Sequence, residues 1–270
     1  MKIYSTPAGV AVRAGERWLC ARDFSFDQLF RESEPAAWLR SRLEEGGIAA
    51  SGNCHPPLGG QEVWAAGVTY YRSREARMEE SEREADVYDR VYRAKRPELF
   101  FKATPHRVVG HGGEVRIRED SQWNVPEAEL ALAVNREGRV FGFTIGNDMS
   151  SRSIEGDNPL YLPQAKIYDG SCALGPCLLV SEVPLPPSTE ISLRITRRDA
   201  EVFRGSSQLS KLKRTPEELV GYLFRDNSFP NGCYLLTGTG IVPESDFTLA
   251  SGDEIEITIE PIGTLTNQVS

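Results

Sequence analysis

The sequence has 270 residues, of which 40% are hydrophobic, and its formal net charge is −8. This length and apolar content suffice for one large domain, or for a catalytic domain with a small appendage. The negative charge disfavours nucleic acids and anionic membranes as partners. Because the sequence has neither a long apolar run nor a signal-peptide pattern at its start, we expect a cytoplasmic protein.

The cysteines and histidines do not form a recognisable metal or disulfide pattern. The five cysteines are scattered and contain no C-x-x-C pair, so neither a disulfide framework nor a structural zinc site is expected. The three histidines lack the spacing of a zinc motif. We therefore expect His55, His106 and His111 to lie in loops or at the surface.

Residues 1–60 are predicted to form a small α+β module that ends in a linker. Two β-like runs surround Ala14-Gly15 in "GVAVRAGERWLCA", which indicates a hairpin. A helix is expected in "SEPAAWLRSRLEE", with Ser33 as the N-cap and Pro35 in the first turn. The Gly/Pro-rich stretch "ASGNCHPPLGGQ" is typical of a linker.

Residues 61–270 have a mostly β pattern and are predicted to form one catalytic domain. Candidate strands lie in "EVWAAGVTY", "VFGFTIGN", "CLLVSEV", "EISLRITRR", "AEVFRG" and "DEIEITIEPIG". Helices are expected at 73–95 and from Thr215, with Pro216 in the first helical position and Glu218 closing a capping box. Long strands with few helices favour a β-rich α+β fold, built as a sandwich or roll, over a βαβ repeat.

Two carboxylates interrupt the apolar strand that is predicted in "WNVPEAELALAVN", residues 123–135. Strand side chains alternate between faces, so Glu127 and Glu129 share a face that continues with Ala131 and Ala133. The opposite face is apolar throughout. This pattern predicts that the glutamates lie at the mouth of a strand covered on both sides. An edge strand with two exposed glutamates is the alternative.

Two buried carboxylates that lie close together repel each other unless a cation lies between them. The next strand, in "VFGFTIGNDMSSRS", follows a hairpin turn and brings Asp148 back toward the same end of the sheet. Carboxylate oxygens suit Mg²⁺, Mn²⁺ or Ca²⁺ rather than zinc. The sequence therefore predicts a divalent-cation site at Glu127, Glu129 and Asp148.

Several motifs, taken in order, resemble the fumarylacetoacetate hydrolase superfamily across roughly residues 62–269. They are the E-x-E strand, the N-D-x-S-x-R turn, a D-x-x-x-x-L-G-P segment and the final G-D-E-I…I-G-x-L-x-N. The resemblance implies a mixed β-sandwich roll, Mg²⁺ or Mn²⁺ held by the three carboxylates, a 2-oxo acid substrate, and a homodimer or homotetramer. Because members cleave C–C bonds, decarboxylate, isomerise or dehydrate, the fold alone does not select the reaction.

One departure from the family pattern narrows the reaction. Hydrolases and decarboxylases of this superfamily carry G-x-N-Y-x-x-H near the start of the domain, and this histidine activates water together with a lid glutamate. Here the segment reads "GVTYYRSREARMEES", with Thr69 in place of the asparagine and Ser73 in place of the histidine. This segment, "PELFFKAT" and the short interval between Glu129 and Asp148 resemble the branch of 2-keto-3-deoxy-sugar-acid dehydratases.

The resemblance therefore implies a metal-dependent dehydratase that converts a 2-keto-3-deoxy-pentonate into 2,5-dioxopentanoate through a metal-stabilised enolate. In this reaction a base removes a proton from C3 and an acid helps the C4 hydroxyl to leave. A hydrolase or decarboxylase of acylpyruvate or oxaloacetate type is the alternative. A non-catalytic module that binds a 2-oxo acid is a third reading.

The resemblance also implies roles for individual side chains. Glu98 is assigned to proton transfer, since burial would raise its pKa into a useful range, and its alternative is a surface glutamate at a helix end. Lys166 is placed beside the metal, where it stabilises the enolate or acts as an acid. Four further residues are candidates for substrate binding, and for Lys102 an indirect role or a strand-end position is equally open: Ser73, Lys102, Arg152 and Thr239.

Overall fold

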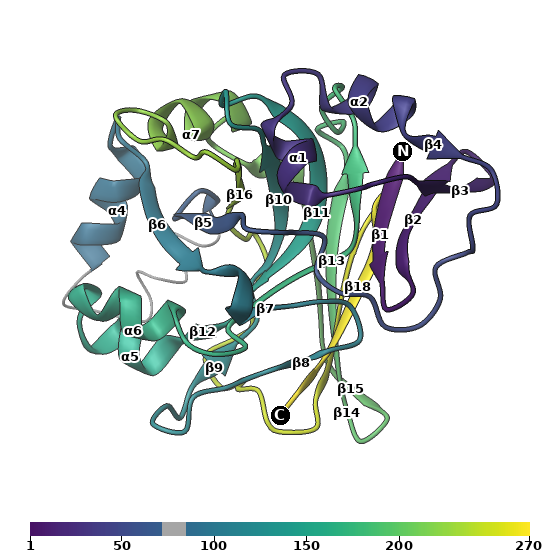
Figure 1. Ribbon diagram of the computed structural model, residues 1–270. Helices are drawn as coiled ribbons and strands as arrows, with labels where there is room; N and C mark the ends of the chain where they lie inside the picture. Colours follow the sequence, from purple (N-terminus) through teal and green to yellow (C-terminus); the bar gives the residue numbers. More distant parts are fainter. Residues whose placement is uncertain (72–84) are drawn as a thin grey trace.

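The computed structural model describes residues 1–71 and 85–270, and two β-sheets dominate its architecture (Figure 1). The larger sheet has the strand order β4-β3-β2-β1-β13-β11-β10-β16-β5-β6, with β7 paired to β13. The smaller sheet has the order β15-β14-β17-β18-β8, and β9 pairs with β12 separately. The helices of the described chain are few and short, so the predicted β-rich α+β class is confirmed.

The larger sheet consists of β1 (Lys2–Thr6), β2 (Gly9–Ala14), β3 (Arg17–Ala21), β4 (Leu43–Glu44), β5 (Glu62–Gly67), β6 (Glu98–Ala103), β7 (Val108–Val109), β10 (Ala128–Val134), β11 (Val140–Asp148), β13 (Cys172–Val180) and β16 (Cys233–Leu236). The smaller sheet consists of β8 (Glu114–Val115), β14 (Glu190–Arg197), β15 (Ala200–Gln208), β17 (Glu254–Ile259) and β18 (Gly263–Val269). The separate pair consists of β9 (Asn124–Val125) and β12 (Ser150–Ser151). The helices are α1 (Phe26–Arg31), α2 (Pro35–Ser41), α4 (Ala85–Arg93), α5 (Arg152–Asp157), α6 (Leu162–Lys166) and α7 (Pro216–Leu223). Three 3-10 turns join them: η1 (Pro105–Arg107), η2 (Pro159–Tyr161) and η3 (Leu209–Lys211).

Strand β10 is buried along its whole length and separates two apolar cores. One of its faces packs against the smaller sheet in the first core, through Ala128, Leu130, Leu132 and Val134. The other face packs beneath α1 and α2 in the second core, through Ala131 and Ala133. The alternation predicted from the sequence is thus confirmed, and the strand is covered on both sides, which excludes the exposed edge strand.

A β-bulge sets the register between β10 and β11. Ala133 lies opposite Gly142, but its neighbour Val134 lies opposite Val140. Phe141 is therefore an extra residue on β11 that has no counterpart on β10. Between the bulge and the open end of the hairpin, the register is regular. The extra residue Phe141 therefore determines which side chains of the two strands share a face.

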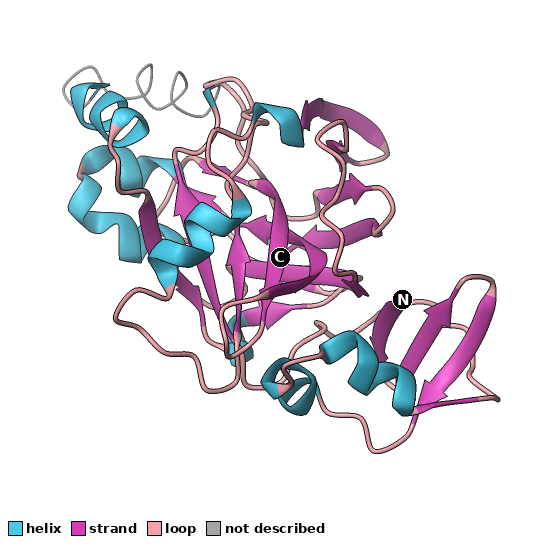
Figure 2. Cartoon of the chain, turned by 90° about the horizontal axis from the view of Figure 1, so that it is seen from above, coloured by secondary structure: helices cyan, strands magenta, loops and turns pink. Residues whose placement is uncertain are grey.

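The N-terminal strands continue the larger sheet, because β1 pairs antiparallel with β13. Figure 2 shows β1 to β3 with α1 and α2 beside them at one end of the molecule. The predicted hairpin is confirmed, with β2 pairing to β3 up to Ala14 and Arg17. The expected cap at Ser33 is wrong: α2 begins at Pro35 and its N-cap is Glu34. A proline in the first helical position forces the residue just before it out of the helix.

Helix α7 begins as the sequence predicts. Thr215 is its N-cap, and the Thr215 hydroxyl accepts a hydrogen bond from the Glu218 backbone N–H at 3.2 Å. The Glu218 carboxylate, however, accepts a hydrogen bond from Arg214 Nη1 at 2.6 Å, so its contact is with the preceding arginine. Of the helix expected at 73–95, α4 lies within the described residues, and 73–84 lie outside them.

The remaining expectations concern cysteines, histidines and membrane segments. All five cysteines lie in the described part of the chain and are free thiols. The histidines lie in loops or in η1, as expected, and His111 Nδ1 accepts a hydrogen bond from the Thr266 N–H at 3.1 Å. Within residues 1–71 and 85–270, none of the helices has the length and apolar character needed to cross a bilayer.

Candidate active site

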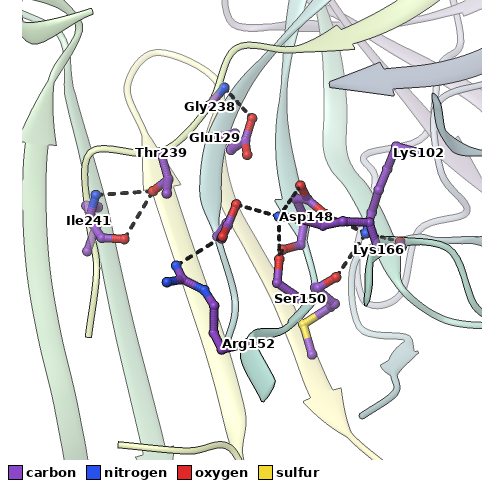
Figure 3. A network of polar contacts seen from close by, with 11 residues as sticks. Lys102, Glu129, Asp148, Ser150, Arg152, Lys166, Gly238, Thr239 and Ile241 are labelled. Atoms are coloured by element: carbon purple, nitrogen blue, oxygen red, sulfur yellow. Dashed lines mark hydrogen bonds and ion pairs between the residues drawn. The ribbon is translucent and has the colours of Figure 1, made fainter. Parts of the chain in front are cut away.

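Three buried carboxylates meet at the end of the β10–β11 hairpin (Figure 3). Glu127 directly precedes β10, Glu129 lies in it, and Asp148 is the last residue of β11. The Asp148 N–H donates to the Glu127 carbonyl at 3.0 Å, and one oxygen of each carboxylate lies within 4.8 Å of the others. The structure thus brings together the three residues that the sequence selected as metal ligands.

Two cationic side chains contact this cluster, Arg152 from α5 and Lys166 from α6. The Lys166 ammonium donates to Glu127 Oε2 at 2.9 Å, to Asp148 Oδ2 at 3.0 Å and to the Ser150 hydroxyl at 2.6 Å. Arg152 Nη2 donates to Glu127 Oε1 at 3.1 Å. All of these groups are buried, and charge-assisted hydrogen bonds of this kind are stronger than neutral ones. Arg152, a candidate for substrate binding, therefore contacts a predicted metal ligand.

Lys102 also contacts Asp148. Its ammonium lies 2.5 Å from Asp148 Oδ1 and donates to the Met149 carbonyl at 2.9 Å and to the Lys166 carbonyl. The side chain is 0% exposed. The sequence placed Lys102 among the substrate-binding candidates, and the structure places it beside a predicted metal ligand.

Glu129 differs from the other two carboxylates in its partners. It accepts a hydrogen bond from the Gly238 N–H at 2.5 Å. Burial raises the pKa of Glu129 well above its usual range, and the charges of Asp148 and Glu127 raise it further, against the opposing effects of Lys166 and the Gly238 N–H. The cluster thus contains a carboxylate that is costly to ionise, and a cation beside it would lower that cost.

A small cavity opens onto the cluster, and it is lined by residues from separate parts of the chain. Among them are Glu98, Asp148, Arg152, Lys166 and Thr239. Four of the predicted catalytic and substrate-binding residues therefore line one cavity together with two predicted metal ligands, Glu127 and Asp148. Lys166 is among the described residues that line this cavity, whereas Lys102 is not among them.

Glu98 reaches this cavity because a glycine lies beneath it. Glu98 opens β6 and pairs with Gly67 on β5. A Cβ atom at position 67 would lie 2.1 Å from Glu98 Oε2, so only glycine lets the carboxylate lie flat against the neighbouring strand. The side chain is half-buried and belongs to a strand rather than to a helix end.

Thr239 lies in a tight turn beside the carboxylates. Its hydroxyl donates to the Ile241 carbonyl at 3.2 Å and accepts from the Ile241 N–H at 3.1 Å. Gly238 has φ +90°, and a Cβ there would lie 2.0 Å from the Thr69 hydroxyl oxygen, so the turn requires glycine. The Gly238 N–H donates to Glu129, so the turn holds a predicted metal ligand.

Sequence reasoning missed two side chains of this site. The Ser150 hydroxyl accepts from Lys166 and donates to the Asp148 carbonyl at 2.9 Å, and it belongs to the N-D-x-S-x-R motif. Glu155 is 5% exposed and lines the cavity. Its position three residues after Arg152, on the same side of α5, was the available signal. Ser73 lies outside the described residues.

Comparisons with known proteins agree with this site. Residues 63–270 match the family model described as fumarylacetoacetate (FAA) hydrolase, C-terminal. The chain is 50% identical over 215 residues to a probable 2-keto-3-deoxyxylonate dehydratase of Haloferax volcanii, covering 79% of this chain and 74% of that one. It is 46% identical over 217 residues to 2-dehydro-3-deoxy-D-arabinonate dehydratase of Saccharolobus solfataricus, covering 79% and 73%.

A solved structure extends the similarity over the whole chain. It is 2-keto-3-deoxy-D-arabinonate dehydratase complexed with magnesium and 2,5-dioxopentanoate, and it matches with a TM-score of 0.86 and 35% identity. The match covers 100% of this chain and 99% of that one. The family that the sequence motifs indicated is thereby confirmed. This chain belongs to the fumarylacetoacetate hydrolase family.

Proposed function

We propose that the protein is a Mg²⁺-dependent dehydratase that converts a 2-keto-3-deoxy-pentonate into 2,5-dioxopentanoate. The observation that carries this proposal is the buried group Glu127, Glu129 and Asp148, of which Glu127 and Asp148 line the same cavity as Glu98 and Lys166. The similarity to dehydratases of this substrate class supports it, as does the magnesium in a structural neighbour.

The chemistry of the three carboxylates fits a hard divalent cation. The cluster supplies oxygen donors, which Mg²⁺, Mn²⁺ and Ca²⁺ prefer, and no described cysteine or histidine is among them. The raised pKa of Glu129 is a second sign, since a carboxylate that is costly to ionise gains most from a cation. We infer that Glu127, Glu129 and Asp148 hold Mg²⁺, with Mn²⁺ or Ca²⁺ as substitutes.

When bound, this cation polarises the C2 carbonyl of the substrate and so acidifies the C3 hydrogens. Glu98 then removes a proton from C3, for which its position at the cavity wall is suitable. Lys166 supplies positive charge beside the developing negative charge on the substrate oxygen. Arg152 holds Glu127 through its hydrogen bond and so keeps that carboxylate in place.

Loss of the C4 hydroxyl as water leaves a C3=C4 double bond beside the C5 alcohol. The product 2,5-dioxopentanoate carries an aldehyde at C5, so a proton must afterwards leave C5 and one must add at C3, which gives a C4=C5 enol. This enol then gains a proton at C4 and loses its hydroxyl proton to become the aldehyde. A carboxylate that has accepted the first C3 proton can return it to C3, and Glu98 meets this requirement. The sequence reads Ser73 where hydrolases carry a water-activating histidine, and this reaction needs no such histidine.

The test is a coupled assay on the purified protein. With 2-keto-3-deoxy-D-arabinonate or its xylonate epimer and Mg²⁺, a 2,5-dioxopentanoate dehydrogenase is expected to report product. A chelator should abolish the signal and added Mg²⁺ should restore it. Absence of product with every 2-keto-3-deoxy acid would refute the proposal. Turnover of acylpyruvate or oxaloacetate well above that with free Mg²⁺ would instead support the hydrolase or decarboxylase.

We further propose the finer features that the family resemblance implies. The two sheets form a mixed β-sandwich roll, residues 1–60 form a small module, and residues 61–270 form the catalytic domain. The protein acts in the cytoplasm, a location that five free thiols suit, and it assembles as a homodimer or homotetramer. Light scattering of the purified protein tests the assembly, and expression of 61–270 alone tests the domain division.

A further inference from the structure

We propose that Lys102 is a positioning residue that fixes the orientation of Asp148 and the end of the helix carrying Lys166, and that it does not touch the substrate. This inference rests on the metal site of the proposed function. Lys102 comes from β6, Asp148 from the end of β11, and Lys166 from the end of α6. One ammonium group thus joins three elements that are far apart in the sequence.

The three hydrogens of an ammonium group allow three hydrogen bonds. Lys102 donates two of them to the Met149 and Lys166 carbonyls, and its ammonium also forms an ion pair with Asp148 Oδ1. Its side chain is 0% exposed, and the described lining of the cavity does not include it. A substrate in that cavity therefore meets other groups than Lys102 (Figure 3).

Lys166 provides the contrast within the same cluster. The described hydrogen bonds of its ammonium go to side chains. They are those of the predicted metal ligands Glu127 and Asp148 and that of Ser150. Lys166 also lines the cavity. A dication at the carboxylates competes with these contacts, whereas the two backbone carbonyls that hold Lys102 take no part in that competition. Lys102 is thus the fixed ammonium of the pair, and Lys166 is the exchangeable one.

The arrangement also distinguishes the two oxygens of Asp148. Lys102 lies against Oδ1, while Oδ2 faces Lys166, which reaches Glu127 as well. The two ammonium groups thus place positive charge at different oxygens of Asp148. Groups that orient a metal ligand in this way typically change metal affinity or activity by roughly 10–100-fold when removed.

The experiment measures Mg²⁺ binding to the metal-free protein by calorimetry, without substrate. Lys102→Met keeps the buried stem and removes the ammonium, and Lys211→Met is the matched control on exposed η3. For Lys102→Met we expect Mg²⁺ affinity to weaken roughly 10–100-fold, with the KM for substrate at saturating Mg²⁺ within about twofold of wild type. The control should match wild type in both measurements.

Three outcomes would overturn the proposal. Tighter Mg²⁺ binding would mean that Lys102 acts only as a repelling charge, and unchanged binding would remove its positioning role. A raised KM with unchanged Mg²⁺ affinity would mean that it binds substrate. Because the calorimetry needs no turnover, a wild-type protein that binds Mg²⁺ without dehydrating any sugar acid would refute the proposed function and leave this inference standing.

A second measurement does not depend on the variant folding. A crystal structure of the wild-type protein with Mg²⁺ and pyruvate is expected to show Lys102 still donating to the Met149 and Lys166 carbonyls. The Lys102 ammonium should also remain beside Asp148. An ammonium of Lys102 turned toward pyruvate would contradict the proposal.

Discussion

One face of β10 packs leucines and valine into the core between the sheets, whereas the other face begins with Glu127 and Glu129. Both faces are equally buried, but burial has opposite consequences for them. Apolar area removed from water stabilises the fold at roughly 25 cal/mol per Å², while buried charges cost several kcal/mol unless they are well paired. The comparison teaches that one strand can hold the fold together on one side and carry an intrinsically unfavourable site on the other.

The sharpest way to separate the two faces is Glu129→Gln. Activity should fall by roughly 10³-fold or more, because the cation loses a ligand and with it several kcal/mol of transition-state stabilisation. The metal-free variant should melt at or above the wild-type temperature, since a carboxylate that is costly to ionise has been removed. Assay and thermal melting check this against Glu190→Gln, which changes the exposed first residue of β14. A large drop in melting temperature would show that the carboxylate face of β10 also stabilises the fold.

Glu98→Gln tests the chemistry on the site side without removing a ligand. We expect kcat to fall by roughly 10²–10⁴-fold because proton transfer loses its base. Mg²⁺ affinity should stay within about twofold, as Glu98 lies outside the three-carboxylate group. Steady-state kinetics and calorimetry measure the two quantities. Full activity in this variant would assign the proton transfer to another residue, with Glu155 as the next candidate.

Leu132→Ala probes the apolar face. The side chain is fully buried between the sheets, so its truncation should lower the free energy of unfolding by about 2–5 kcal/mol. Activity per folded molecule should stay close to wild type, because Leu132 points away from the carboxylates. Urea titration and an assay at low temperature measure both. A variant that is stable but inactive would show that the two faces are not independent.

A smaller effect is expected from pH. The pKa of Glu129 in the folded, metal-free protein is raised above its unfolded value, so between those two values the folded state holds a proton that the unfolded chain has released. Stability of the metal-free protein should therefore fall as pH rises through this window. Mg²⁺ binding should strengthen by about tenfold per pH unit there, because the ion displaces that proton. Calorimetry in buffers of different ionisation enthalpy counts the protons released. A Mg²⁺ affinity that does not change with pH would contradict this expectation.

The sequence predicted those parts of the site that local pattern controls. The period of two along β10 placed Glu127 and Glu129 on one face, and the hairpin returned Asp148 to them. The cap at Thr215 followed from local chemistry in the same way. The position of Glu98 in the cavity wall was implied by family resemblance rather than by any local pattern.

Long-range contacts were beyond the sequence alone. The role of Lys102 depends on carbonyls 47 and 64 residues away, and no periodicity encodes which backbone oxygens will converge on one ammonium. The parallel pairing of β5 with β16 is equally remote in sequence, and the pairing of β5 with β6 places Gly67 beneath Glu98. Ser33 was chosen as a cap by its residue type, whereas the proline at position 35 decided the start of the helix.

The bulge at Phe141 has a consequence for how the gene tolerates insertions and deletions. Opposed residues of an antiparallel pair point to the same face, and a one-residue slip turns every side chain to the other face. Because β11 holds one residue more than its pairing with β10 uses, the loss of one codon from this strand can be absorbed by flattening the bulge, and Asp148 then keeps its place. A codon gained between the bulge and Asp148 cannot be absorbed in this way. With the turn held in register, it would bring Asp148 opposite Pro126 and turn the carboxylate toward the apolar core, although every ligand residue is still encoded.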